Sequence, residues 1–66
     1  MSIAKTVELS CESAVSFEDA IKTGMRRAEE TLKNVKGAWI SEQKVVAENG
    51  SIVSYRVTMR VSFVLN

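Results

Sequence analysis

The chain has 66 residues, of which 45% are hydrophobic, and its nine basic and eight acidic residues give a formal net charge of +1. This length allows a single domain, residues 1–66, whose core seldom supplies more than about 3–5 kcal/mol. One Cys excludes an internal disulfide, and the lack of His excludes a Cys/His zinc site. The balanced charge shows no basic footprint for nucleic acid or an anionic membrane. Oligomerisation is therefore the expected source of extra stability.

A strand and an amphipathic helix are predicted first. Apolar and polar residues alternate from Ile3 to Cys11, which predicts a strand. Ser16 is a suitable N-cap for a helix that begins at Phe17. Apolar residues at steps of three and four predict a helix of about 18 residues, with Asn34 and Gly37 marking its end. This apolar stripe comprises Phe17, Ala20, Ile21, Gly24, Met25, Ala28, Leu32 and Val35.

A long β-hairpin is predicted for the rest of the chain. The pair Asn49-Gly50 joins two alternating runs, Ala38–Glu48 and Ser51–Leu65, and is typical of a type I′ turn. If this pair forms the loop, the numbers of opposed residues sum to 99 throughout the hairpin. One face of the hairpin is then the core, and the other is polar except for Trp39. The core face of the second run comprises Val53, Tyr55, Val57, Met59, Val61, Phe63 and Leu65.

The predicted fold class is α+β, in the order βαββ. A right-handed crossover places the first strand beside the last, which gives a three-stranded antiparallel sheet in the order 2-3-1 with the helix across one face. The strand Ile52–Leu65 would extend roughly 45 Å, whereas a domain of this size is about 25 Å across. The turn end of the hairpin would then protrude with apolar side chains on both faces, which predicts contacts with other subunits.

Catalysis has little support in the sequence. Without His, a general base near neutral pH would have to be a strongly shifted carboxylate or Lys. Cys11 stands in an apolar row, where it fits a small buried hydrophobe better than a nucleophile. The three Gly residues form no phosphate-binding run. We expect a non-enzymatic, soluble and cytoplasmic protein with neither signal peptide nor membrane span.

The polar face of the hairpin is the candidate functional surface. In the predicted register Trp39 lies opposite Arg60, and Gln43 lies opposite Arg56. An aromatic ring, hydrogen-bonding groups and two cations on one face could hold a flat, anionic heteroaromatic ligand. The alternative is that Trp39 packs against a neighbouring subunit, because Trp and Arg are enriched as interface anchors.

Two segments resemble the dodecin family, namely the helix run from Arg27 to Val35 and the closing strand from Tyr55 to Leu65. The resemblance covers nearly the whole chain and is most specific in the closing strand. It implies a hollow homododecamer, a shell of cubic symmetry in which each βαββ protomer wraps its sheet around its helix. Many dodecins bind riboflavin or flavin mononucleotide (FMN) in pairs at two-fold axes, stack the flavin on a tryptophan, and act as flavin stores or buffers.

Compared with the family that it resembles, this chain differs at two positions of the flavin site. Gly37 takes the place of the flavin-stacking tryptophan, and Trp39 follows two residues later, about 7 Å along the strand. Arg56 takes the place of the flavin-bonding glutamine. The candidate flavin site therefore comprises Gly37, Trp39, Gln43, Arg56 and Arg60.

The same resemblance also allows a second interpretation of the function. The Tyr55-Arg56 pair, without tryptophan at the stacking position, resembles a dodecin subgroup described as calcium-binding. This implies a flavin-free dodecameric shell that is structural or binds calcium or another cation. Trp39 and Arg60 themselves would then fill the interface between subunits.

Overall fold

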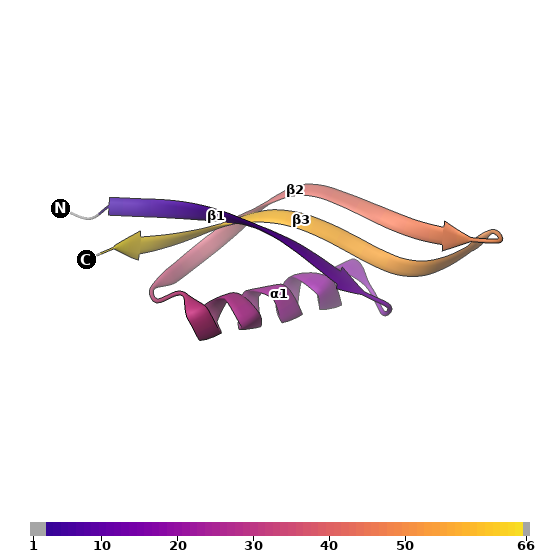
Figure 1. Cartoon of the computed structure of the whole chain (residues 1–66), viewed down its shortest axis with the longest axis horizontal. Coiled ribbons are helices and arrows are strands. Elements are labelled where there is room, and N and C mark those ends of the chain that lie inside the picture. Colours follow the sequence, from indigo (N-terminus) through magenta and orange to yellow (C-terminus); the bar gives the residue numbers. More distant parts are fainter. Residues whose placement is uncertain (1–2, 66) are drawn as a thin grey trace.

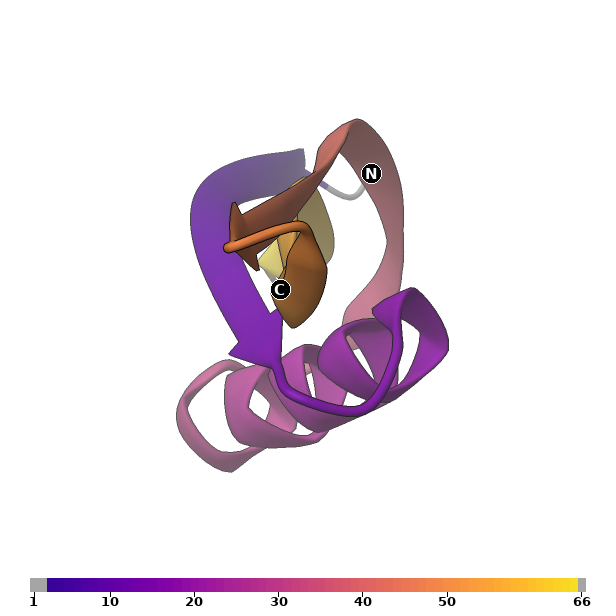
Figure 2. The same cartoon turned by 90° about the vertical axis from the view of Figure 1, so that its right-hand side faces the viewer.

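The computed structural model describes residues 3–65 and contains one helix and three strands. The elements are β1 (Ile3–Ser13), α1 (Phe17–Thr31), β2 (Val35–Glu48) and β3 (Ser51–Leu65). The strands form an antiparallel sheet in the order β1-β3-β2, and α1 crosses one face of it (Figures 1 and 2). The predicted βαββ fold is therefore confirmed.

The hairpin makes the molecule elongated. Its principal extents are 52 × 19 × 13 Å, and the turn between β2 and β3 projects well beyond the end of α1 (Figure 1). Asn49 and Gly50 both have positive φ angles, 51° and 80°, as a type I′ turn requires. The turn and the protruding hairpin are as the sequence predicts.

The helix begins at Phe17, directly after its N-cap residue Ser16. Ser16 has extended backbone angles, and its Oγ accepts a hydrogen bond from the Asp19 N–H at 2.9 Å. The Ser13 hydroxyl donates to Asp19 Oδ2 at 2.6 Å and ties the end of β1 to this first turn. Carboxylates at positions 18 and 19 also oppose the positive end of the helix. The predicted start at Phe17 is confirmed.

The predicted end of the helix is wrong. α1 has 15 residues and stops at Thr31, and the chain reverses through Asn34, whose φ is +60°. The Asn34 carbonyl accepts a hydrogen bond from the Val64 N–H at 3.1 Å. Val35 is therefore the first residue of β2, opposite Phe63, and does not belong to the helical stripe. The helical spacing of apolar residues continues past the last turn of α1, but from Asn34 onward the backbone forms hydrogen bonds with β3 instead of within the helix.

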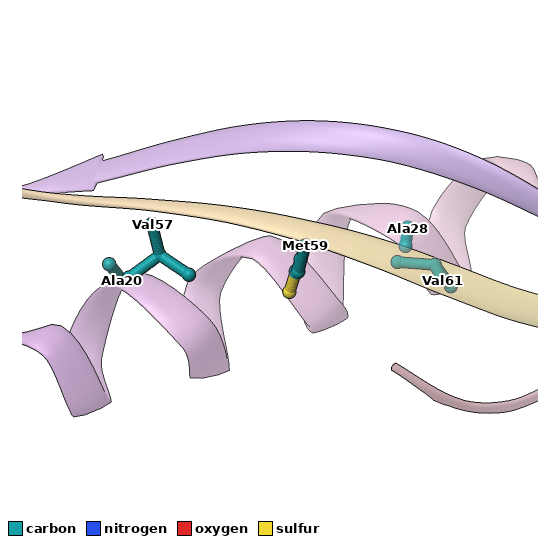
Figure 3. Packing of buried hydrophobic residues seen from close by; sticks show 5 residues of the cluster. All are labelled: Ala20, Ala28, Val57, Met59 and Val61. Atoms are coloured by element: carbon teal, nitrogen blue, oxygen red, sulfur yellow. The ribbon is translucent and has the colours of Figure 1, made fainter. Parts of the chain in front are cut away.

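The core lies between α1 and the central strand. Val57, Met59 and Val61 are fully buried, and their side chains face Ala20 and Ala28 of α1 (Figure 3). The small helix residues let the backbone of α1 approach the sheet closely. The alternation therefore predicts the core face correctly for the middle of β3, from Val57 to Phe63. At its two ends the prediction is wrong, because Val53 and Leu65 are 42% and 47% exposed.

The register of the hairpin departs from the prediction between two bulges. Near the turn, and again from Ile40 to Gly37, opposed residue numbers sum to 99 as predicted. From Glu42 to Val46 they sum to 100, because Val53 is an extra residue in β3 and Ser41 is an extra residue in β2.

Between the two bulges, each side chain of β2 lies on the face opposite to the predicted one. Numbers that sum to 99 would place Val46 on the core face and Val45 opposite Ser54. In the structure Val45 lies opposite Tyr55 on the core face and Val46 lies opposite Ser54, so this prediction is wrong. A bulge also increases the local twist and bends the strand. Alternation in the sequence cannot locate such a shift, because both valines are apolar.

Helix and sheet lie very close together at Gly24. A Cβ at this position would overlap Cys11 Sγ and would lie 2.8 Å from Met59 Cε. We expect Gly24→Ala to lower the melting temperature. The overlap costs about 1–3 kcal/mol, and the cost is near the upper end of this range because the strand is tightly packed. This exceeds the ~1 kcal/mol of helix propensity that Ala gains over Gly. Thermal unfolding at matched protein concentration measures the effect.

The matched background for this substitution is Cys11→Ala, which removes the sulfur that the new methyl group meets. Gly24→Ala should cost less in that background than in the wild type. Equal losses in the two backgrounds would contradict the overlap as the cause.

Candidate functional site

The sheet face turned away from α1 carries rows of side chains that run across all three strands. We call it the outer face. Each row takes one residue from β1, one from β3 and one from β2, because the two ladders share the central strand. In order from the chain termini toward the hairpin turn, the rows are Thr6–Ser62–Gly37, Glu8–Arg60–Trp39, Ser10–Thr58–Glu42 and Glu12–Arg56–Lys44.

Trp39 is an open aromatic surface on this face. Its side chain is opposite Arg60, as predicted, and the residue is 68% exposed. Gly37 lies in the next row, and a Cβ placed there would meet no atom within 4 Å. Across this row the Ser62 hydroxyl donates a hydrogen bond to the Gly37 carbonyl at 3.3 Å. The indole therefore borders free space that a flat ligand or another chain can occupy.

Arg56 is held toward β1 by a carboxylate. Its Nε and Nη2 donate to the same oxygen, Oε1 of Glu12, at 2.9 and 2.7 Å. This hydrogen bond, together with the positive charge of Arg56, lowers the pKa of Glu12 below its usual value. Both side chains are nearly half exposed, so water screens the pair and its contribution to stability is small. Its main effect is to orient the guanidinium.

The structure does not bring Gln43 opposite Arg56, so that prediction is wrong. Gln43 lies opposite Val57, and Lys44 takes the predicted place beside Arg56. Counted from the turn, the extra residue Val53 shifts the register by one position and Ser41 restores it, so that Lys44 replaces Gln43 opposite Arg56.

A polar depression occupies this part of the outer face. It has a volume of about 280 Å³ and is lined by Glu42, Gln43, Lys44, Arg56 and Thr58. Sequence reasoning missed Glu42 and Lys44 as members of the surface. The signal that could have found them is the polar alternation of Glu42 and Lys44 themselves, read with a bulge after Ile40.

Cys11 belongs to the opposite side of the sheet. It packs on the core cluster next to Gly24, and burial raises the pKa of its thiol, which disfavours the reactive thiolate. A mostly apolar pocket of about 240 Å³ lies beside it between β1 and α1. These contacts fit a small core side chain.

Neither a metal cluster nor a spanning helix is found within residues 3–65. No three of the Cys, Asp and Glu residues described there come together as a metal site. No helix in this part of the chain is long and apolar enough to cross a membrane.

Fold and site together define a small α+β protein with a single helix on one side of its sheet and an aromatic, cationic face on the other. The Dodecin family model matches residues 3–66, and the chain belongs to the dodecin family. Among curated proteins it is similar to the calcium dodecin of Mycobacterium tuberculosis, with 27% identity over 63 residues that cover 96% of this chain and 89% of the relative.

Solved dodecin structures have the same fold. A mutant of the T. thermophilus dodecin has a TM-score of 0.93 and 27% identity over 100% of this chain and 98% of that one. The dodecin from Streptomyces davaonensis has a TM-score of 0.92 and 28% identity over 98% and 96% of the two chains. The calcium dodecin of Mycobacterium tuberculosis, solved with a calcium-binding site, has a TM-score of 0.83 and 26% identity over 97% and 91%.

The Glu12–Arg56 pair predicts a dependence of stability on pH. Because the pKa of Glu12 is lowered in the folded chain, the pair stabilises the protein above the unfolded value of about 4.3, and this contribution is lost as pH falls through the folded pKa. Wild type should therefore melt slightly above Glu12→Gln at pH 7, and the two should converge as pH falls from about 4.3 toward 3.

The control is Glu29→Gln on the helix, which removes one negative charge without touching Arg56. It corrects for the change in net charge at each pH. A difference between wild type and Glu12→Gln that stays constant from pH 7 to 3 would show that the pair has no role in stability.

Proposed function

We propose that this chain is a non-enzymatic, flavin-binding dodecin that assembles into a homododecameric shell and stores or buffers riboflavin or FMN. The observation that carries this proposal is the exposed indole of Trp39 on the outer face, with Arg60 opposite it and open space at Gly37.

Stacking is the interaction that the indole can offer. A flat heteroaromatic ring on an exposed aromatic side chain gains about 1–3 kcal/mol per ring, judged from nucleic-acid bases. Arg60 adds donors for a carbonyl oxygen or for an anionic ring beside the indole. The family places its stacking tryptophan at the position of Gly37, one row away, so the vacant space there and the displaced indole belong to the same surface.

Assembly is supported by the apolar surface that one chain leaves exposed. Ile3, Val15, Trp39, Ile40, Val45, Ile52, Val53 and Leu65 are each at least 40% exposed. Burial of such surface stabilises a complex by about 25 cal/mol per Å². Most of these residues lie near the two ends of the long sheet, beyond the cover of α1 (Figure 1). Neighbouring copies of the chain would cover them in a shell.

The second candidate function is a flavin-free shell, structural or calcium-binding. Two observations support this candidate. Nε and Nη2 of Arg56 already donate to Glu12, which leaves fewer donors for a flavin. The calcium dodecin of Mycobacterium tuberculosis is similar to this chain over most of its length. In this shell Trp39 and Arg60 of neighbouring copies pack against each other and leave no room for a flavin. The two candidates therefore differ in whether Trp39 accepts a ligand.

Flavin titration distinguishes them. We expect micromolar protein to quench the fluorescence of added riboflavin and FMN, and Trp39→Ala to weaken binding about tenfold or more through loss of stacking. Trp39 is the only Trp of the chain, so its own fluorescence should fall in parallel. Tyr55→Phe is the matched control, because Tyr55 packs edge-on against Phe17 on the helix side of the sheet.

Flavin fluorescence that stays unquenched by the wild type would overturn the flavin proposal. A rise in melting temperature with added calcium, absent with magnesium, would then support the second candidate.

The oligomeric state is a separate prediction. Light scattering should give a mass about twelve times the 7.3 kDa of one chain. Ile52→Asp should reduce this mass, because it places a charge on the exposed apolar tip of the hairpin, whereas Ser51→Asp at the neighbouring exposed position should not. A monomer or dimer mass for the wild type at micromolar concentration would contradict the shell.

A further inference from the structure

The pocket between β1 and α1 is apolar where it meets the core and charged at its edge. Leu9, Cys11 and Ala20 contribute apolar atoms, and the exposed side chains of Glu12 and Arg27 border the opening. Its volume of about 240 Å³ is below the ~300–1,000 Å³ of common small-molecule sites. A space of this size suits one or two aliphatic side chains.

The tip of the hairpin is an apolar projection that its own chain does not bring to this pocket. Ile52 is 53% exposed, and it lies five residues, or about 17 Å, along β3 from Val57, the residue opposite Cys11. The strands stay paired out to Glu48 and Ser51, and the turn projects beyond the end of α1 (Figure 1). A paired hairpin does not fold back on itself, so Ile52 can enter such a pocket only on another copy.

The charges beside the two surfaces are complementary. At the tip, Glu48 forms no ion pair with any side chain of residues 3–65. At the edge of the pocket, the Arg27 side chain is 78% exposed and has an ion-pair contact with Glu30, from Nε to Oε1, at 3.5 Å. Its guanidinium forms no hydrogen bond within the described part of the chain, so it has donors for a carboxylate from outside. Such complementarity fixes the orientation of a contact.

We propose that the hairpin tip of one copy of this chain docks in the pocket between β1 and α1 of a second copy. Ile52 of one copy then lies against Cys11 of the other, and Glu48 lies beside Arg27. The inference rests on the proposed homododecameric shell and deepens it, because it names the two surfaces that meet. The surfaces differ, so the contact is heterologous, and its repetition closes into a ring when the rotation between copies allows.

Cys11 is a native probe of this contact, because it is the only Cys of the chain and lines the pocket. In the assembled Ile52→Cys variant, a short bis-maleimide linker should join the introduced thiol to Cys11 of the next copy. This reagent tolerates distances that a disulfide does not. Each chain has one tip and one pocket, so a denaturing gel should show a ladder of products larger than the dimer. Adding Cys11→Ala should abolish the ladder.

Ile3→Cys is the matched control, since Ile3 is an isoleucine of similar exposure, 63%, at the opposite end of the sheet. It should give no ladder. Absence of the ladder from Ile52→Cys, or dimers alone that persist without Cys11, would overturn the docking. A ladder from Ile3→Cys in place of one from Ile52→Cys would overturn it as well, because the other end of the sheet would then fill the pocket.

Labelling of Cys11 by a small maleimide tests the same contact without an introduced thiol. In the shell, the docked tip should slow labelling of the wild type about tenfold relative to Ile52→Asp, whereas Ser51→Asp should react like the wild type. Equal rates for wild type and Ile52→Asp would overturn the docking, while a dodecamer mass by light scattering leaves the shell in place. A monomer mass for the wild type would overturn the shell and the docking with it.

Discussion

Contact between the buried face of β3 and the small residues of α1 is the constraint on which the rest of the structure depends. Val57, Met59 and Val61 are fully buried against a helix surface of Ala20 and Ala28, and the close approach also requires Gly24. Because residues alternate along a strand, this burial turns every intervening side chain of β3 to the opposite face. The functional surface is thus a consequence of the core.

The same constraint explains the unusual shape. One helix of 15 residues covers only the middle of the sheet in a molecule 52 Å long, so apolar side chains near both ends of the sheet stay exposed (Figure 1). A core this small also leaves the free energy of unfolding of a lone chain low. The outer face and the hairpin tip are therefore the surfaces that the chain itself leaves uncovered.

The two bulges of the hairpin determine which side chains the outer face carries. With a regular register, Gln43 would stand beside Arg56 and the face would offer an amide and a guanidinium. With Val53 and Ser41 as extra residues, Lys44 lies there instead, and Glu42 lies opposite Thr58. The outer face therefore carries side chains of both charges, Glu42, Lys44 and Arg56, two rows or fewer along the sheet from the row of Trp39.

The sequence by itself determined the βαββ order, the helix start after Ser16 and the turn at Asn49-Gly50, because each rests on a local pattern. The predicted pairing of Trp39 with Arg60 also holds, because the two bulges cancel each other before the count from the turn reaches Ile40. Only the tertiary structure decided where α1 ends and which residues neighbour Arg56. Those features depend on competition between local periodicity and pairing with β3, and on bulges that bend the sheet. Alternation of apolar and polar residues carries no signal for a shift of one position when the residues on either side suit both faces.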